Sequence, residues 1–246
     1  PGREDTIQGK LETALSRILG EPIEISGSGR TDAGVHAKGQ VASFHCESPM
    51  PPAEILANLR RYLPEDIGIY SCREVSARFH ARLNAREKTY VYRIWNSEAP
   101  CVFERRFVTV MPERLDVEAM NRAGALLVGR HDFSAFCGNP KMKKSTVREL
   151  TALTVTRQGE NIVLRFTGNG FLYNMVRITA GTLALIGQGK LPEDALARAI
   201  ASHERLDLGY TAPAKGLTLM RVLYPGQDEL AREILRQKLL FNAEKA

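Results

Sequence analysis

The sequence lacks most of the features that tie a protein to a membrane, an oxidising compartment or a metal. None of its apolar runs reaches the roughly eighteen residues that a transmembrane helix needs, and no secretory signal opens it. We therefore expect no membrane span and a cytoplasmic location. Its four cysteines are scattered, without a Cys-x-x-Cys pair or a neighbouring histidine pair, at Cys46, Cys72, Cys101 and Cys137. Such spacing predicts reduced, packed thiols and no metal site.

Two common nucleotide-binding motifs are also missing. Residues 27–38 read GSGRTDAGVHAK and begin like a dinucleotide fingerprint, but Asp32 stands where the third glycine belongs. A phosphate-binding P-loop needs Gly-Lys-Ser/Thr at the start of a helix, and the chain has no such sequence. Internal repeats and low-complexity segments are absent too. The loop at residues 27–38 must therefore be interpreted by its own residues.

What the sequence does contain is an excess of positive charge in an otherwise ordinary globular composition. Of its 246 residues, 43% are hydrophobic and 25% charged, the net charge is +6, and the pI is near 9.2. This length suits one large or two small domains, and the charge favours an anionic partner. Arginines and lysines crowd residues 60–93, interleaved with Tyr, Phe and Trp. Cations and rings together favour RNA binding, although most of these rings, taken individually, are better explained as core residues of strands.

A second basic cluster follows a Gly-Asn-Pro sequence and comprises Lys141, Lys143, Lys144 and Arg148. It is either a solvated loop or an arm that binds phosphates, and we favour the arm.

Hydrophobic periodicity and capping residues predict helices and strands in both halves of the chain. The expected helices cover residues 7–19 (capped by Thr6 and ended by Gly20), 53–62, 116–128, 172–186, 192–203 and 228–241. The expected strands cover residues 23–25, 40–45, 67–75, 88–95, 106–111, 149–157, 162–167 and 216–225, with a compact loop at 129–136. This pattern predicts an α+β fold, a mainly antiparallel mixed sheet with flanking helices. Residues 1–80 would form an N-terminal α/β half that carries the Asp32 loop, and residues 81–246 a C-terminal half.

The loop at residues 27–38 is the most unusual stretch of the chain. Its three glycines allow positive φ angles and a close approach of the backbone to a ligand. It is longer than the two to five residues that usually join two strands, and it carries Arg30, Thr31 and Asp32. One interpretation is a turn in which Asp32 caps backbone N–H groups and pairs with Arg30. The other is a functional loop.

The sequence RTDAGVHA, residues 30–37, resembles the catalytic loop of the TruA family of tRNA pseudouridine synthases. Three later segments resemble the family in the same order: FHAR with KTYVY, then GNGFLYNMVRITAG, then APAKGLTLMRVLYP. The similarity extends from Thr6 to Pro225. The family's opening strand, with its Tyr-Asp-Gly and Gly-Trp-Gln segments, has no counterpart in this sequence, so its RNA contacts are not assigned.

The resemblance implies a role for each matching residue. Asp32 would be the catalytic carboxylate, Arg177 its partner, Tyr90 the ring that stacks on the target base, and Leu217 a residue that packs against the uracil. By pattern alone, Arg177 is an arginine on an apolar helix, which either reaches the surface or meets a buried acid. Tyr90 is equally compatible with a buried strand aromatic. The implied RNA contacts are Arg30, Arg78 and Lys88, the last at a position where family members often carry arginine.

The implied activity is the conversion of uridine to pseudouridine at positions 38, 39 and 40 of the tRNA anticodon stem-loop. The implied fold places two α/β halves around a central cleft, and the implied assembly is a homodimer with one tRNA lying across both subunits. The reaction needs a carboxylate but no cofactor and no metal. Two alternatives stay open: a non-catalytic RNA-binding protein, and a hydrolase that uses Asp32 with His36. Gly34 argues against the helix that would bring those two side chains together, and we expect His36 and His131 to be structural.

Overall fold

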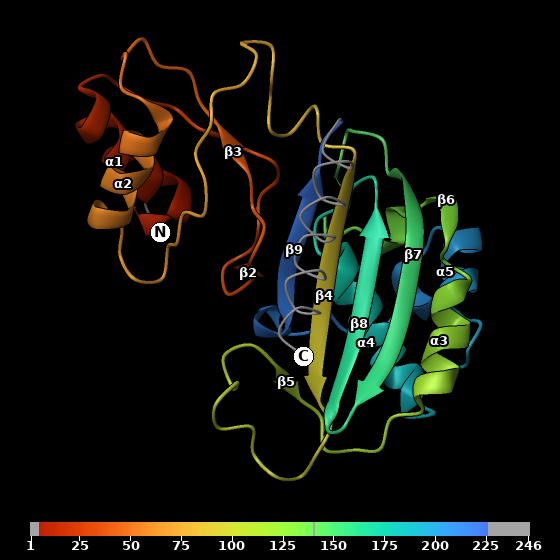
Figure 1. The fold of residues 1–246 in the computed structure, drawn as a ribbon. Coiled ribbons are helices and arrows are strands. Elements are labelled where there is room, and N and C mark those ends of the chain that lie inside the picture. Colours follow the sequence, from red (N-terminus) through yellow and green to blue (C-terminus); the bar gives the residue numbers. More distant parts are fainter. Residues whose placement is uncertain (1–4, 140, 226–246) are drawn as a thin grey trace, which may run out of the picture. The chain divides into compact units, whose positions relative to one another are not determined.

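A computed structural model describes residues 5–139 and 141–225 (Figure 1). The chain divides into two compact units, one containing Val41–Asn84 and the residues up to Arg30, the other containing Thr31–Gln40 and the chain from Ala85 onward. The boundary between Asn84 and Ala85 lies near the division expected at residue 80. The loop at residues 31–40, which we had assigned to the N-terminal half, groups with the second unit.

The first unit packs two helices over a short antiparallel ladder. Helix α1 (Ile7–Leu19) begins at Thr6, whose hydroxyl accepts a hydrogen bond from Gly9 N, and it ends at Gly20 with φ 75°. Helix α2 spans Pro52–Tyr62, and strands β1 (Ser26–Gly27) and β3 (Ala42–Ser43) pair antiparallel. A small core joins them, made of Leu15, Ile23, Ile25, Ile55 and Leu59.

The second unit is built on a seven-stranded mixed sheet among the described residues. Its strands are β2 (His36–Ala37), β4 (Glu87–Trp95), β5 (Thr109–Val110), β6 (Gly129–Asp132), β7 (Val147–Gln158), β8 (Asn161–Gly168) and β9 (Leu217–Leu223). The order is β2-β9-β4-β8-β7-β6, and β5 pairs with β4. Strands β2 and β9 run parallel, as do β4 and β5, and the other pairs are antiparallel.

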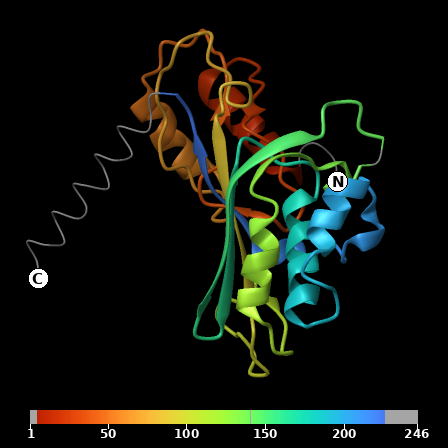
Figure 2. The same ribbon diagram turned by 90° about the vertical axis from the view of Figure 1, so that its right-hand side faces the viewer.

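Three helices cover one face of this sheet, as Figure 2 shows. They are α3 (Val117–Ala125), α4 (Met175–Gly187) and α5 (Ala195–Ser202). Asp116 caps α3 by accepting a hydrogen bond from Ala119 N at 2.9 Å. The core between helices and sheet contains the fully buried rings of Tyr92, Phe133 and Phe136. This is the α+β class that the periodicity predicted, with the helices on one side of the sheet.

Several predicted elements differ from the observed ones. The strands expected at residues 40–45 and 106–111 shrink to the two-residue strands β3 and β5, and the strand expected at residues 23–25 is absent, with β1 lying just after it. The segment 129–136, expected as a loop, contains strand β6 and a 3₁₀ turn, Ser134–Phe136. No strand forms at residues 67–75. The helix expected at residues 228–241 lies outside the described residues.

Residues 67–75 alternate in hydrophobicity but find no partner strand. The guanidinium of Arg60 donates to the carbonyl oxygens of Ile69 and Tyr70, both at 2.9 Å, and so satisfies backbone groups that a neighbouring strand would otherwise satisfy. Tyr70 remains 77% exposed. An alternating pattern predicts a strand only where a neighbouring strand is available.

Two further properties concern the chain as far as the structure describes it. All four cysteines are free thiols. None of the described helices combines the length and the apolar composition that crossing a membrane requires.

Candidate active site

The RTDAG loop is anchored on the edge of the large sheet. Strand β2 pairs His36 with Thr218 of β9, and Lys38 N donates to Leu219 O at 2.8 Å. The imidazole Nε2 of His36 lies 2.8 Å from the carbonyl oxygen of Arg106. These contacts hold the end of the loop, so the position of Asp32 four residues earlier is set by the sheet.

Gly34 permits the turn that presents Asp32. Its φ of +82° is rare for residues with a side chain, and a Cβ at this position would lie 3.3 Å from Cβ of Ala214. Val35 N donates to Asp32 O at 3.0 Å and closes the turn. The carboxylate is thereby held just before the strand, at a tight backbone turn.

Asp32 forms an ion pair with Arg177, which lies 145 residues further along the chain. Nη1 of Arg177 is 2.9 Å from Oδ2 of Asp32, and the two side chains are 17% and 29% exposed, respectively. The arginine belongs to α4, whose other side chains are largely buried and apolar. It therefore meets an acid, one of the two possibilities that its position on an apolar helix left open.

The guanidinium is fixed by two further hydrogen bonds. Nε donates to the carbonyl oxygen of Ala212 at 2.7 Å, and Nη1 donates to Oδ1 of Asn174 at 3.1 Å. In return, Ala212 N donates to the carbonyl oxygen of Arg177 at 3.1 Å. Because a guanidinium is planar, contacts at Nε and Nη1 fix the orientation of the whole group.

Tyr90 lies on β4, half-buried, against the same core. Its ring meets Phe171 edge to face with centroids 5.2 Å apart. Burial and, to a smaller degree, the negative charge of Asp32 raise the pKa of Tyr90 to about 12. The phenol is therefore neutral at physiological pH and within electrostatic reach of the carboxylate.

Tyr92, two residues further along β4, is a core residue. It is fully buried, and its hydroxyl lies 2.7 Å from Thr109 Oγ1 and donates to Pro213 O at 3.0 Å. Burial raises its pKa as well. The pairing of β4 with β9 shifts register between Thr89 and Tyr90.

The remaining residues singled out by the sequence have different surroundings. Leu217 is 6% exposed and belongs to the core against which Tyr90 packs; it pairs with Tyr92 across the strands. Lys88 is half-buried near the start of β4. Arg30 and Arg78 are exposed residues of the first unit, and neither side chain forms an ion pair with another described residue.

The basic cluster after Gly138 adjoins the segment that leads into α4. Gly138 N donates to Tyr173 O at 2.8 Å. Arg148 turns back on its own loop and donates to the carbonyl oxygens of Ser145 and Val147, while burial lowers its pKa. The three lysines of the cluster are exposed.

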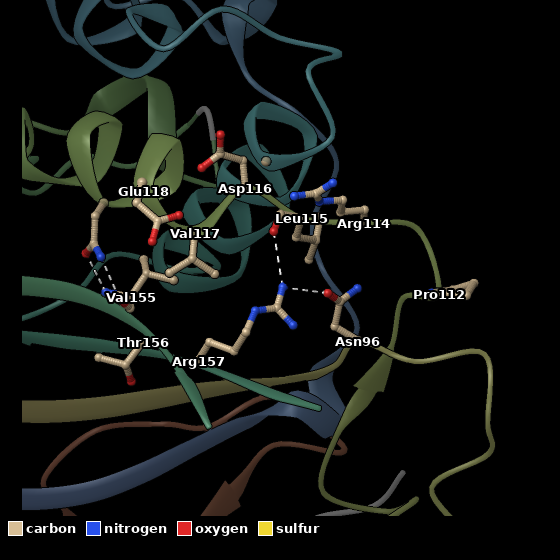
Figure 3. A pocket seen from close by; sticks show the side chains of 12 residues that line it. Asn96, Pro112, Arg114, Leu115, Asp116, Val117, Glu118, Val155, Thr156 and Arg157 are labelled. Atoms are coloured by element: carbon tan, nitrogen blue, oxygen red, sulfur yellow. Dashed lines mark hydrogen bonds between the residues drawn. The ribbon is translucent and has the colours of Figure 1, made fainter. Parts of the chain in front are cut away.

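A separate open pocket lies at the start of α3 (Figure 3). Its polar side chains largely satisfy one another: Arg157 Nη2 donates to Asn96 Oδ1 at 2.8 Å and to Leu115 O at 3.1 Å. Asp32, Tyr90 and Arg177 do not line it. Its groups thus tie α3 to the sheet and do not belong to the Asp32 site.

Sequence reasoning missed Asn174, Ala212 and Phe171 as members of the site. The segment GNGFLYNMVRITAG contains two of them, but no motif rule assigns a role to an asparagine before a helix or to a backbone carbonyl. Among residues 5–139 and 141–225, no group of three or more His, Cys, Asp or Glu side chains is placed to hold a metal ion.

Comparison with known proteins bears on the whole chain. A family model described as tRNA pseudouridine synthase matches residues 1–84 and 123–225. A protein from Brevibacillus brevis, tRNA pseudouridine synthase A, is 45% identical over 219 residues, which cover 89% of this chain and 90% of the relative. Proteins from Bacillus cereus (tRNA pseudouridine synthase A 2) and Acetivibrio thermocellus (tRNA pseudouridine synthase A) are each 42% identical over 219 residues, covering 89% of this chain and 89% and 90% of the respective relatives. The match covers the Asp32 loop and the Arg177 helix together, and the chain belongs to the tRNA pseudouridine synthase family.

Proposed function

We propose that this protein isomerises uridine to pseudouridine in tRNA and that Asp32 is the catalytic carboxylate. The observation that carries the proposal is the ion pair between Asp32, on the RTDAG loop, and Arg177, on α4. The ion pair orients a carboxylate in a chain whose family performs this reaction. The Asp32 site is distinct from the polar pocket at α3.

The reaction is an isomerisation, so its atoms balance within the substrate. The bond between N1 of uracil and C1′ of the ribose breaks, the base turns, and a bond forms between C5 and C1′. A proton leaves C5, and a proton ends on N1. No electrons are gained or lost. A carboxylate that attacks the sugar or the base, or that assists elimination, is therefore sufficient as the central catalytic group.

Arg177 and Tyr90 support this carboxylate in different ways. The guanidinium orients the carboxylate of Asp32 through a charge-assisted hydrogen bond. Tyr90 would hold the uracil by stacking, with Leu217 packing beside it. Its phenol, with a pKa of about 12, is protonated in the resting enzyme and can serve only as a relay of the C5 proton, because it has no negative charge to begin with.

Exposed cations would bind the tRNA backbone. In the first unit these are Arg30 and Arg78, both exposed and without an ion pair to another described residue. In the second unit they are the exposed lysines that follow Gly138, joined by the half-buried Lys88. Arg30, two residues before Asp32, would contact the phosphate of the extruded nucleotide, because the reacting sugar is inaccessible in a stacked stem.

The same proposal includes the substrate positions, the assembly and the location. The substrate uridines would be those at positions 38, 39 and 40 of the anticodon stem-loop. The protein would act in the cytoplasm as a homodimer with one tRNA across both subunits. Mapping of pseudouridines in treated tRNA transcripts tests the substrate positions, and sedimentation of the protein with and without tRNA tests the assembly.

The deciding experiment measures tritium release from tRNA transcripts that carry tritium at C5 of uridine, with no cofactor added. Asp32→Asn keeps the size of the side chain but removes its charge, so release should fall to background while tRNA affinity is retained. Asp194→Asn, an exposed carboxylate on the same unit, serves as the matched control and should release tritium at the wild-type rate.

Two outcomes would contradict the proposal. Tritium release by Asp32→Asn close to the wild-type rate would remove Asp32 from the chemistry. Tight tRNA binding without any release by the wild-type protein would instead favour a non-catalytic RNA-binding protein.

A further inference from the structure

Asn174 adopts a backbone conformation that few residues with a side chain tolerate. It stands immediately before α4 with φ 60° and ψ 1°, in the left-handed region. Among the described residues, only His203 shares a positive φ without being glycine. Such strain persists where the surrounding structure imposes it, and it often marks a functional site. Asparagine is one of the few residues that accepts it at low cost.

The side chain of Asn174 does not make the contact usual for its position. An asparagine that precedes a helix normally accepts a hydrogen bond from a backbone N–H of the first turn. In this structure the side chain makes no capping bond, and Oδ1 accepts from Nη1 of Arg177 at 3.1 Å. A guanidinium can only donate, so the amide oxygen must be the atom that faces it. The amide therefore serves Arg177 instead of the helix end.

The hydrogen bonds of Nη1 show why this matters. Nη1 carries two hydrogens: one is donated to Oδ2 of Asp32 at 2.9 Å and the other to Asn174. Nε is held by Ala212 O at 2.7 Å. Without the amide oxygen, one hydrogen of the nitrogen that holds the carboxylate would lose its acceptor. The guanidinium could then turn away from Asp32 about its remaining contacts.

Gly138 closes the other side of Asn174. A Cβ at Gly138 would lie 2.8 Å from Nδ2 of Asn174 and 3.0 Å from Cδ1 of Tyr173, so only glycine fits there without displacement. Gly138 N also donates to Tyr173 O at 2.8 Å. The amide is thus enclosed between Gly138 and Arg177, which restricts its rotation.

We infer that Asn174 is a positioning residue for the catalytic ion pair: its strained backbone and its amide oxygen hold Arg177 in the orientation that presents Asp32. The inference rests on the proposed function of Asp32. The position has two requirements: a residue that accepts a positive φ, and a side chain that supplies an uncharged hydrogen-bond acceptor. Glycine meets only the first requirement. Aspartate supplies an acceptor but adds a second carboxylate that competes with Asp32 for one guanidinium.

Asn174→Gly and Asn174→Asp separate these requirements. We would measure single-turnover tritium release at saturating tRNA, the dissociation constant for tRNA, and the thermal midpoint. Asn174→Gly should keep the midpoint and the affinity but release tritium about tenfold more slowly, as expected for the loss of one hydrogen bond to a charged group. Asn174→Asp should also release tritium more slowly, because its added carboxylate competes with Asp32 for the donors of Arg177.

His203→Gly is the matched control, since it removes the other non-glycine side chain that is held at a positive φ, at the end of α5. It should release tritium at the wild-type rate. A wild-type rate for Asn174→Gly would overturn the inference. So would a loss of rate that is fully accompanied by loss of tRNA affinity and thermal midpoint, because that would indicate a purely structural role. An inactive wild-type protein would instead contradict the proposed function itself.

Discussion

Tyr90 combines two properties that constrain its chemical role. Its ring is half-buried against Phe171, and burial together with the charge of Asp32 raises its pKa to about 12. Tyr90→Phe keeps the ring but removes the proton that a relay would pass on. We expect this variant to bind tRNA with nearly wild-type affinity and to release tritium about a hundredfold more slowly.

Tyr90→Leu serves as the companion variant because it removes the stacking ring as well, which should weaken tRNA binding by about tenfold. Both variants can be compared by filter binding and single-turnover kinetics. Tritium release by Tyr90→Phe at the wild-type rate would assign the C5 proton to another group.

The raised pKa of Tyr90 also predicts how stability depends on pH. The unfolded chain ionises this phenol near pH 10, whereas the folded protein resists ionisation until about pH 12. The contribution of the neutral Tyr90 phenol to the free energy of unfolding is therefore complete below pH 10. As the pH rises to 12, roughly 2 kcal/mol of this contribution is lost. Urea unfolding between pH 9 and pH 12 should show a smaller loss of stability for Tyr90→Phe than for the wild type. Tyr70→Phe, at a 77% exposed tyrosine, should leave the wild-type loss unchanged.

At the scale of single residues, the sequence predicted the ion pair but not the groups that hold it. Asp32 and Arg177 could be identified because motif resemblance and an arginine on an apolar helix point to the same pair. Asn174 and the carbonyl of Ala212 could not, since a backbone angle and a carbonyl direction depend on how separate segments pack. The two members of the ion pair are thus easier to predict than the groups that position them.

Helix α4 positions the site through its contact with the segment that precedes β9. Arg177 bonds to Ala212 in both directions, and Gly181, one turn later on the same face, faces Tyr210. A Cβ at Gly181 would overlap the carbonyl oxygen of Tyr210. Gly181→Ala should therefore push this segment away from α4 and lower the free energy of unfolding by about 1–3 kcal/mol. It should also slow tritium release, because the displaced Ala212 would hold Arg177 less firmly.

Gly124→Ala in α3 provides the comparison for this prediction. Its Cβ would meet Cδ2 of Leu153 at 2.6 Å, a contact that a side-chain rotation can relieve. It should change the free energy of unfolding by less than about 1 kcal/mol, since alanine also favours the helix, and leave the rate unchanged. Equal effects of the two substitutions on the rate would contradict the role assigned to the contact of α4 with residues 210–212.

At the scale of elements, local pattern succeeded where a partner strand is available, whether close or distant in sequence. Strands β7 and β8 form the hairpin expected on either side of Gly159, and β4 pairs in register with β8 over its length. Residues 67–75 carry a similar alternation but form no strand, and Arg60 instead donates to the carbonyl oxygens of Ile69 and Tyr70. Periodicity therefore identifies segments with one face that can be buried, and pairing with a neighbouring strand decides which of these segments become strands.

At the scale of the whole molecule, the net charge of +6 predicts that binding to tRNA depends steeply on salt. Each neutralised phosphate releases counterions, which lowers the logarithm of the binding constant by about 0.7–0.9 per tenfold increase in salt. The slope therefore counts phosphate contacts, whereas the affinity at one salt concentration does not. A positive charge contributes to it only where it faces the RNA, so the slope can distinguish one basic surface from another.

This distinction tests whether the lysines after Gly138 contact the tRNA. Lys143 and Lys144 are exposed near the segment that enters α4, whereas Arg114 and Lys190 are exposed toward the other end of that helix. Replacing Lys143 and Lys144 together by alanine should reduce the magnitude of the salt slope by the amount expected for about two phosphate contacts. The same charge change at Arg114 and Lys190 should leave the slope at its wild-type value. Filter binding from low to physiological salt measures both slopes. Equal slopes for the two double variants would mean that the lysine loop is solvated and that the tRNA backbone follows another surface.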